Sequence, residues 1–344
     1  MVEEKIYAKK VSRPKINYDE RLTKVRLGMN EYRPNISKKL CEKILENMNA
    51  EKLSSYPNIN SAYTALSKYL NIDKENLLIT SGADMAIRII FEALCNRKDI
   101  ISTIAPSFEM YRIHAEIMGC EYNEYLCGKN GEIGVDILCK KINDGTKLLI
   151  IANPNGVTGY CFNKEQIRKI AQIAQKNNVI LVIDETYGDY GNIDVSELLK
   201  DYSNLIIIRS FSKNVGLAGL RIGYVISSKE IIHIIDKFNL MMEINSVAVE
   251  AIKVVCKNEK IIENAVNKIL KAKEYTIKVL EKKGYRFICG KGNFILIDMN
   301  GKNQTKKKLD INNIEYKENI QNFKGYIRLT IGEKGLMKKV MKCF

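Results

Sequence analysis

The sequence lacks several features on which common enzyme chemistries depend. Its 344 residues contain no tryptophan, no HExxH motif and only two histidines, His114 and His233. So few histidines do not favour a catalytic triad that uses histidine or a histidine-rich metal site, and we expect no metal. No apolar run approaches the roughly 20 residues that a membrane-spanning helix needs. The first ten residues also lack the apolar segment of a secretory signal.

The cysteines show no pattern that would suggest cross-links or zinc. There are nine, an odd number, without a CxxC pair or regular spacing. Several lie in apolar stretches, among them Cys95, Cys120 and Cys256. We therefore expect neither a disulfide framework nor a zinc site, and the reducing cytoplasm is the simpler setting.

The net charge of +15 raises the question of nucleic-acid binding. The lysines are, however, spread along the chain and mixed with glutamates, as in residues 257–284. Apolar residues recur there at helical spacing, so most of these lysines lie on the solvated face of a helix. We expect neither a nucleic-acid nor a membrane partner, and the basic surface predicts solubility and attraction of anions.

Short apolar segments alternate with helical patterns over much of the chain. Strands are predicted at 77–80, 100–104, 147–152, 179–183, 205–209 and 222–226. Helices are predicted at 37–53, 61–70, 83–95 and 163–177, with another ending at Met118. Strands this apolar, separated by helices, predict an α/β fold with a largely parallel sheet buried on both faces.

Ligands bind such sheets at the carboxyl ends of the strands. Polar motifs follow four of the predicted strands: SGAD at 81–84, NPNGVTG at 153–159, DETY at 184–187 and SFSK at 210–213. We expect these motifs to converge on one site.

The pattern changes near residue 246. Two long basic helices are expected there, followed by short strands at 293–298 and 325–331 and a lysine-rich loop at 302–308. We expect three parts: an N-terminal arm at 1–28 that packs with the small domain or a partner subunit, a large domain at 29–245 and a smaller C-terminal α/β domain at 246–344.

The segment from Ser210 to Gly223, SFSKNVGLAGLRIG, combines groups that bind phosphate. Lys213 lies beside two serines, and Arg221 follows eight positions later. Serine hydroxyls and a guanidinium form a phosphate clamp, and a lysine beside it can form a Schiff base with an aldehyde cofactor. A glycine-rich turn with an ordinary surface lysine is the alternative interpretation.

Two other motifs allow a functional and a structural interpretation. Asp184 ends an apolar strand, where its carboxylate could hold a protonated pyridine nitrogen or merely cap a helix. Tyr187 could donate a hydrogen bond to an oxygen on the same ring. SGAD precedes a helix whose amides and dipole favour phosphate, although this motif by itself is more typical of a plain helix N-cap.

Together these motifs resemble the fold-type I pyridoxal-phosphate enzymes, and more narrowly the histidinol-phosphate aminotransferase family of class I/II aminotransferases. The resemblance covers residues 24–335. Its most specific parts are SFSKNVGLAGLRIGY and DETYGDY, and five further motifs occur in the same order: NEYRP at 30–34, SYPN at 55–58, TSGAD at 80–84, APSFEMY at 105–111 and YIRLTIG at 326–332. The resemblance implies a large domain with a mostly parallel seven-stranded sheet between helices, a smaller C-terminal α/β domain and a homodimer with shared active sites.

The resemblance also implies roles for individual residues. Lys213 would bind pyridoxal 5′-phosphate as a Schiff base and transfer the proton, Asp184 would pair with the pyridine nitrogen, and Tyr187 would pair with the phenolic oxygen. The other expected cofactor-binding residues are Ala83, Asp84, Phe108, Asn155, Ser210, Ser212, Arg221 and, from the neighbouring subunit, Tyr56. The expected substrate-binding residues are Arg328, which would take a carboxylate, Asn30 and Lys317.

Two positions depart from the family pattern. Gly156 and Val157 stand where Asn and Pro are expected, and that Asn ordinarily donates to the phenolic oxygen. Asn155 is the candidate to take its place, although from the adjacent position its side chain would normally point elsewhere. Lys317 stands where members that act on histidinol phosphate carry an arginine, and lysine is a point charge without the planar fork of arginine.

We therefore expect a cytoplasmic, dimeric, pyridoxal-phosphate-dependent aminotransferase. Its substrates would be an amino donor and a keto acceptor, with a small amino acid or a phosphorylated amino alcohol as the amino compound. One alternative is a decarboxylase of O-phosphorylated threonine or serine, because the orientation of the Cα bonds decides which of them breaks. Another is a coenzyme-binding regulator or inactive homologue, although only about 28 residues precede the first motif, too few for a DNA-binding domain.

Overall fold

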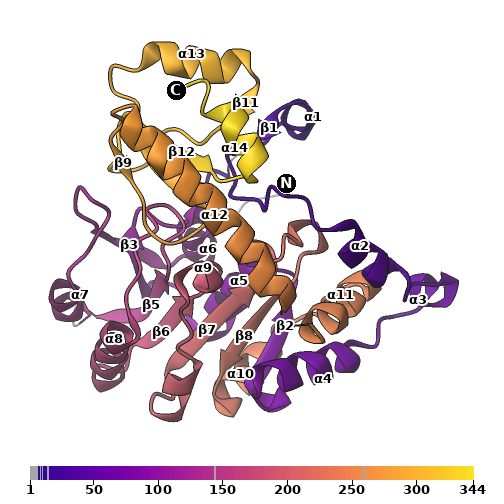
Figure 1. Cartoon of the computed structure of the whole chain (residues 1–344). Coiled ribbons are helices and arrows are strands. Elements are labelled where there is room, and N and C mark those ends of the chain that lie inside the picture. Colours follow the sequence, from indigo (N-terminus) through magenta and orange to yellow (C-terminus); the bar gives the residue numbers. More distant parts are fainter. Residues whose placement is uncertain (1–6, 8, 10, 14, 143–144, 259) are drawn as a thin grey trace, which may run out of the picture.

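The computed structural model describes residues 7–344 except 8, 10, 14, 143–144 and 259. Its main sheet consists of β2 (Leu77–Thr80), β3 (Ile100–Ala105), β4 (Glu121–Leu126), β5 (Thr146–Ala152), β6 (Ile180–Asp184), β7 (Leu205–Ser210) and β8 (Gly223–Ser227). The seven strands lie in the order β2-β8-β7-β6-β5-β3-β4 (Figure 1). Only β8 runs antiparallel to its neighbours, so the predicted mostly parallel sheet is confirmed.

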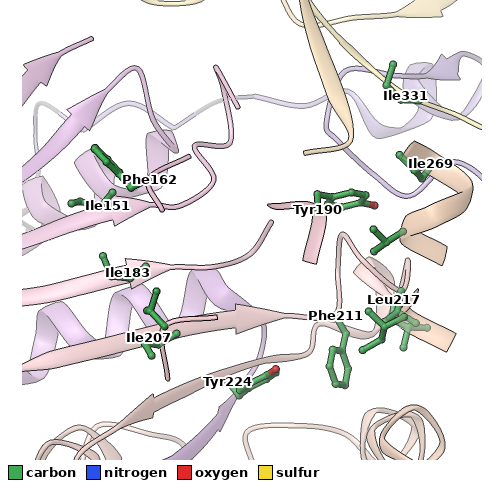
Figure 2. Close-up of a cluster of buried hydrophobic side chains, with 14 of the residues drawn as sticks. Ile151, Phe162, Ile183, Tyr190, Ile207, Phe211, Leu217, Tyr224, Ile269 and Ile331 are labelled. Atoms are coloured by element: carbon green, nitrogen blue, oxygen red, sulfur yellow. The ribbon is translucent and has the colours of Figure 1, made fainter. Parts of the chain in front are cut away.

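Helices cover both faces of this sheet. Because strand side chains alternate between faces, Ile150, Val182 and Ile206 pack with α5 (Ala83–Leu94), α6 (Glu109–Met118) and α10 (Lys229–Asp236). The alternate residues Ile151, Ile183 and Ile207 belong to a second cluster, which includes α8 (Lys164–Lys176) and α7 (Val135–Lys141). Figure 2 shows these three isoleucines on neighbouring strands at the left, and Ile269 and Ile331, members of the same cluster from the C-terminal part of the chain, at the opposite side of the view. The second cluster therefore extends beyond the main sheet.

Two differences from the predicted elements have local causes. The expected helix at 37–53 is broken into α2 (Lys38–Leu45) and α3 (Ala50–Ser54), because the Asn49 side chain accepts the Lys52 amide at 2.9 Å and starts a new helix. Strand β4, absent from the prediction, is a largely exposed edge strand with the polar sequence EYNEYL. Helix α4 (Ile59–Leu70) comes after α3 in the chain and packs against α11 (Ser246–Cys256).

The C-terminal part builds a second, smaller sheet. Strands β9 (Phe287–Ile288), β10 (Phe294–Asp298) and β12 (Tyr326–Thr330) pair antiparallel, with β10 in the centre. Helix α12 (Lys260–Lys282) precedes this sheet and α14 (Lys334–Val340) follows it. The lysine-rich segment 302–308, expected to be a loop, lies largely in helix α13 (Asn303–Ile311). Lysine is a good helix former, and Thr305 and Leu309, four residues apart, give this helix one buried side.

The N-terminal segment lies against this C-terminal part. Helix α1 (Tyr18–Leu22) leads to β1 (Val25–Arg26), which pairs in parallel with β11 (Ile314–Glu315) (Figure 1). The Arg21 side chain forms ion pairs with Glu315 at 2.9 Å and with Glu31 at 2.8 Å. These contacts fix the path of residues 28–33 into the site described below. Residues 1–6, 8, 10 and 14 of the expected arm lie outside the described residues, and the domain boundaries stay a prediction.

The remaining short elements are α9 (Gly188–Gly191) and the 3-10 helices η1 (Lys74–Asn76), η2 (Ser196–Lys200) and η3 (Ala218–Leu220). No helix within the described part of the chain has the length and apolar character needed to cross a membrane.

Candidate active site

The N-terminus of α5 and the start of β8 form a cradle for an anion. The first turn of α5 has no side-chain cap, so its leading amides are free for a ligand. A Cβ built on Gly82 would lie 2.5 Å from Arg221 Nη2, so the missing side chain lets the guanidinium reach this turn. Gly223 is equally constrained, because a Cβ there would lie 2.5 Å from the Ala83 nitrogen. The backbone is therefore shaped to bring Arg221 beside the helix amides.

Two serines at the end of β7 border the same cradle. Thr80 at the end of β2 and Ser210 at the end of β7 both pair with Gly223. The hydroxyls of Ser210 and Ser212 lie 2.9 Å apart, and both residues are buried. Hydroxyls, a guanidinium and helix amides together form a donor set that suits a phosphate group.

Asp184 is a buried carboxylate at the end of β6. One of its oxygens accepts the Tyr111 hydroxyl at 2.6 Å, and the other accepts the Thr186 amide at 2.9 Å. Burial raises the pKa of the Asp184 carboxyl above its ordinary value, while these two hydrogen bonds act in the opposite direction. A cationic ring nitrogen placed against this carboxylate would gain a strong, desolvated partner.

Lys213 follows β7 and presents its amine to the same space. Its Nζ donates to the Met29 carbonyl at 3.0 Å, and its own carbonyl accepts the Tyr190 hydroxyl at 2.8 Å. Burial, reinforced by the positive charge of Arg328, lowers the pKa of Lys213 to about 8. A lysine with such a pKa carries a substantial neutral fraction near neutrality and can act as a nucleophile. The alternative of an ordinary surface lysine does not fit this environment.

The hydroxyl of Tyr187 lies on the other side of the site. It accepts the Asn30 side-chain amide at 2.9 Å, and the same amide donates to the Gly156 carbonyl at 3.2 Å. Burial raises the pKa of Tyr187, and the positive charge of Arg328 and the Asn30 hydrogen bond oppose that shift. The structure thus brings Asn30, expected to bind substrate, into contact with Tyr187.

The Arg328 side chain extends from β12 to the Gly156 carbonyl. Its Nη1 donates to Gly156 O at 2.8 Å and its Nη2 donates to Gly28 O at 3.1 Å, while its buried Nε has no protein partner. Burial lowers the pKa of the guanidinium. The backbone of Lys317 pairs with that of Arg328 in an antiparallel bridge, so both side chains start on the same face. Lys317 itself is exposed.

The structure supports some, but not all, of the coenzyme contacts expected of Phe108, Asp84 and Asn155. Phe108, 44% exposed, packs edge-on against Tyr111 with ring centroids 5.7 Å apart and keeps a face available for stacking. The Asp84 side chain is engaged with His114 Nε2 at 2.9 Å, which leaves its backbone for the cradle. Asn155 accepts the amides of residues 157 and 158 and donates to residue 106, so its side chain organises its own turn. A direct contact of Asn155 with the coenzyme stays a prediction that this geometry does not support.

Sequence reasoning missed two contributors to the site. Tyr111 appears in the motif APSFEMY, but only the fold shows that its hydroxyl meets Asp184. The Met29 carbonyl that accepts from Lys213 is a backbone group and leaves no signal in the sequence.

The α/β fold and this donor set suit a class of protein that binds a phosphorylated, cationic ring carrying an aldehyde at the carboxyl edge of its sheet. A family model described as aminotransferase class I and II matches residues 23–342. The chain therefore belongs to the class I and II aminotransferases, which depend on pyridoxal 5′-phosphate, and it is a transaminase with the fold of the fold-type I enzymes.

Named relatives agree with this assignment. The histidinol-phosphate aminotransferase of Clostridium botulinum strain Hall is 30% identical over 335 residues, covering 94% of this chain and 91% of that protein. The enzyme of the same name from Clostridium novyi strain NT is 28% identical over 325 residues, covering 93% and 90%. A solved histidinol-phosphate aminotransferase from Sinorhizobium meliloti, in complex with pyridoxal-5′-phosphate, aligns with a TM-score of 0.86 at 19% identity, covering 96% and 94%. These findings do not favour the decarboxylase alternative.

Proposed function

We propose that this aminotransferase uses Lys213, Asp184 and Tyr187 as its catalytic residues. The main observation behind this proposal is the Lys213 amine, whose pKa is lowered to about 8. The anion cradle at the start of α5, the buried carboxylate of Asp184 and the buried Arg328 border the same space. Bound pyridoxal phosphate supplies the electron sink for the reaction. Lys213 would hold the coenzyme covalently until the amino donor displaces its amine. The freed Nζ would then take the proton from the substrate Cα and deliver it to the former aldehyde carbon of the coenzyme. Asp184 keeps the ring nitrogen protonated, and Tyr187 donates to the ring's phenolic oxygen.

Replacement of the amine tests this assignment. Lys213→Ala should bind the coenzyme only non-covalently, so gel filtration in a buffer with free amine should strip its visible absorbance. Transfer of an amino group to a keto acid should fall by several orders of magnitude. Lys176→Ala removes an exposed lysine on α8 and serves as the matched control. Full activity of Lys213→Ala would exclude Lys213 as the catalytic residue.

We propose an amino compound with an anionic group as the substrate: a small amino acid or a phosphorylated amino alcohol such as histidinol phosphate. Arg328 has a buried, unpartnered Nε, and Lys317 begins on the same face of the small sheet but is exposed. A buried fork suits a carboxylate held close to the reacting carbon. An exposed lysine suits a bulky phosphate that stays partly hydrated. The names of the relatives support the phosphorylated amino alcohol.

A donor screen distinguishes the substrates. Histidinol phosphate, histidinol, glutamate and small amino acids are added in turn to the holoenzyme, and the change of the coenzyme spectrum to its amine form is followed. Lys317→Gln should raise the KM for histidinol phosphate about tenfold, as expected for one lost charged contact, and leave that for histidinol unchanged. Equal effects on both donors would remove Lys317 from the phosphate site.

We propose that the partner subunit of a homodimer completes the site through Tyr56, which is 83% exposed. Exposed apolar side chains also occupy the segment before α11, including Leu240 at 65% and Met241 at 81%. Glu243, just beyond, accepts the Ser81 amide at 2.8 Å, so this apolar segment adjoins the phosphate end of the site. An apolar surface beside an open site suits burial against a second copy of the chain.

Light scattering during gel filtration tests the dimer. Wild type should elute as a dimer, and Met241→Asp should elute as a monomer with weaker coenzyme binding. Tyr56→Phe should stay dimeric and lose only affinity for the coenzyme. Ile311→Asp on α13, where the wild-type side chain is 79% exposed, controls for a charge placed on an exposed apolar residue. A monomeric wild type would contradict the shared site.

We also place the enzyme in the cytoplasm. All nine cysteines are described and free, which suits a reducing compartment. Fractionation of cells that produce the protein tests this, and recovery outside the cytoplasmic fraction would contradict it.

A further inference from the structure

Asn30 is held rigidly at the boundary between the main sheet and the C-terminal part. It is 1% exposed and has a φ of 53°, a left-handed conformation that asparagine tolerates better than most residues. Its backbone nitrogen donates to Thr330 Oγ1 at 3.0 Å, and its carbonyl accepts from Asn293 Nδ2 at 3.0 Å. Both partners come from the small sheet region, so the residue has little freedom to rotate.

The orientation of the Asn30 amide follows from its partners. Gly156 O is a carbonyl and can only accept, so the atom that faces it at 3.2 Å is the nitrogen. The Asn30 oxygen then faces the Thr330 hydroxyl at 3.3 Å. The nitrogen has two protons, and Gly156 O and the Tyr187 hydroxyl oxygen receive one each.

This contact decides which way the Tyr187 proton points. Because the phenolic oxygen accepts from Asn30 at 2.9 Å, the Tyr187 hydroxyl must donate in another direction. Two charged side chains act on Tyr187. Arg328 has only donors and cannot receive that proton, and the two Asp184 oxygens already accept from Tyr111 and Thr186. The proton is therefore available to an acceptor bound in the site.

Gly156 has no side chain, which explains why the amide that donates to the Tyr187 hydroxyl comes from another segment, at Asn30. A Cβ on Gly156 would lie 3.0 Å from Tyr187 Cε2, so the tyrosine ring rests where a side chain at this position would begin. Position 156 contributes only its carbonyl, which accepts from both Asn30 and Arg328.

We propose that Asn30 is a positioning residue that fixes Tyr187 as a hydrogen-bond donor to the coenzyme's phenolic oxygen, in place of any side chain at position 156. The inference rests on the proposed roles of Lys213 and Tyr187. Asn30 acts through Tyr187 and needs no contact with the substrate.

Replacing the amide by an acceptor tests this role. In Asn30→Asp the carboxylate accepts the Tyr187 proton and turns it away from the coenzyme. A hydrogen bond to the phenolic oxygen favours its negative form, so its loss should raise the pKa read from the coenzyme's visible absorbance. We expect an upward shift of about one pH unit, equal to about 1.4 kcal/mol. Tyr187→Phe should give a similar shift, and the double variant should add little to it, because both changes remove one interaction.

Two further variants separate this role from loss of structure. Asn30→Ala removes the donor without adding charge and should shift the same pKa upward by a smaller amount. Asn153→Asp introduces a carboxylate at another buried asparagine, which bonds Phe162 rather than Tyr187, and should lower the melting temperature without moving the coenzyme pKa. An unchanged pKa in both Asn30 variants would overturn the proposal.

The outcome is separable from that of the proposed function. If Lys213→Ala keeps covalent coenzyme and full activity, the proposed function fails. If Lys213→Ala loses both while the Asn30 variants titrate like wild type, only the inference about Asn30 fails.

Discussion

Replacement of Lys213 by methionine should stabilise the coenzyme-free protein at neutral pH. The folded protein lowers the pKa of Lys213 from 10.5 to about 8, first through burial and then through the positive charge of Arg328. A shift of this size corresponds to about 3 kcal/mol of unfavourable free energy for the charged amine. Methionine also gives up the hydrogen bond to the Met29 carbonyl, worth about 1 kcal/mol. The expected net gain is therefore about 2 kcal/mol.

The difference in the free energy of unfolding between Lys213→Met and wild type should depend on pH in a defined direction. Below pH 8 the amine is protonated in both the folded and unfolded states, and the full penalty applies. Between about pH 8 and 10.5 the unfolded chain binds more protons than the folded one, so wild-type stability rises with pH. The advantage of Lys213→Met should therefore be largest below pH 8 and shrink as the pH approaches 10.5.

Urea unfolding of the coenzyme-free proteins at equal concentration, from pH 6 to 10, measures the difference. Lys176→Met on α8 controls for the loss of a positive charge from the surface. A stability difference between wild type and Lys213→Met that does not change with pH would refute the reasoning, because the penalty would then not arise from a buried charge.

Three further substitutions test the other parts of the site. Tyr111→Phe removes the 2.6 Å hydrogen bond to the buried Asp184 and should cost about 1–3 kcal/mol in urea unfolding, together with weaker coenzyme binding by fluorescence titration; wild-type values for both would contradict this. Gly223→Ala places a methyl group 2.4 Å from the Gly82 carbonyl carbon, so the start of α5 must move, and the dissociation constant of the coenzyme should rise about tenfold or more. Arg328→Lys loses the planar guanidinium and should raise the KM of a donor that carries a carboxylate, such as glutamate, about 10- to 100-fold with a smaller effect on kcat in steady-state assays; an effect confined to kcat would argue against a carboxylate site.

The sequence predicted the main sheet well because its strands are buried on both faces. Strands β5, β6 and β7 are continuous apolar runs that end at polar motifs, and the burial of their residues is nearly complete. Strand β4 has no such signal, because it lies at the edge of the sheet and exposes polar side chains. Helix α13 was misread because its apolar positions are few and its lysines are typical of exposed helices and loops alike.

The candidate site was predicted where adjacent residues share one task. Ser210, Ser212 and Arg221, proposed to hold a phosphate, lie within one short segment, and the fold places them beside the predicted start of α5. Contacts between distant segments left no comparable pattern. The hydrogen bond between Asn30 and Tyr187 joins positions 157 residues apart, and Tyr111 and Asp184 are 73 apart. Such pairs depend on the relative position of two packed elements, which local composition does not specify.

Two other long-range hydrogen bonds, from Asn30 and Arg328, meet at a single backbone atom, the Gly156 carbonyl oxygen. The carbonyl of Gly156 belongs to the loop after β5 of the main sheet, yet both of its donors are fixed by the small sheet. Arg328 is part of β12, and Asn30 is tied to Thr330 on the same strand. A displacement of the small sheet would therefore move Arg328 and the Asn30 amide that donates to Tyr187 together. The proposed binding of the substrate to Arg328 would therefore be coupled to the alignment of the Tyr187 hydroxyl, because the same strand positions both groups.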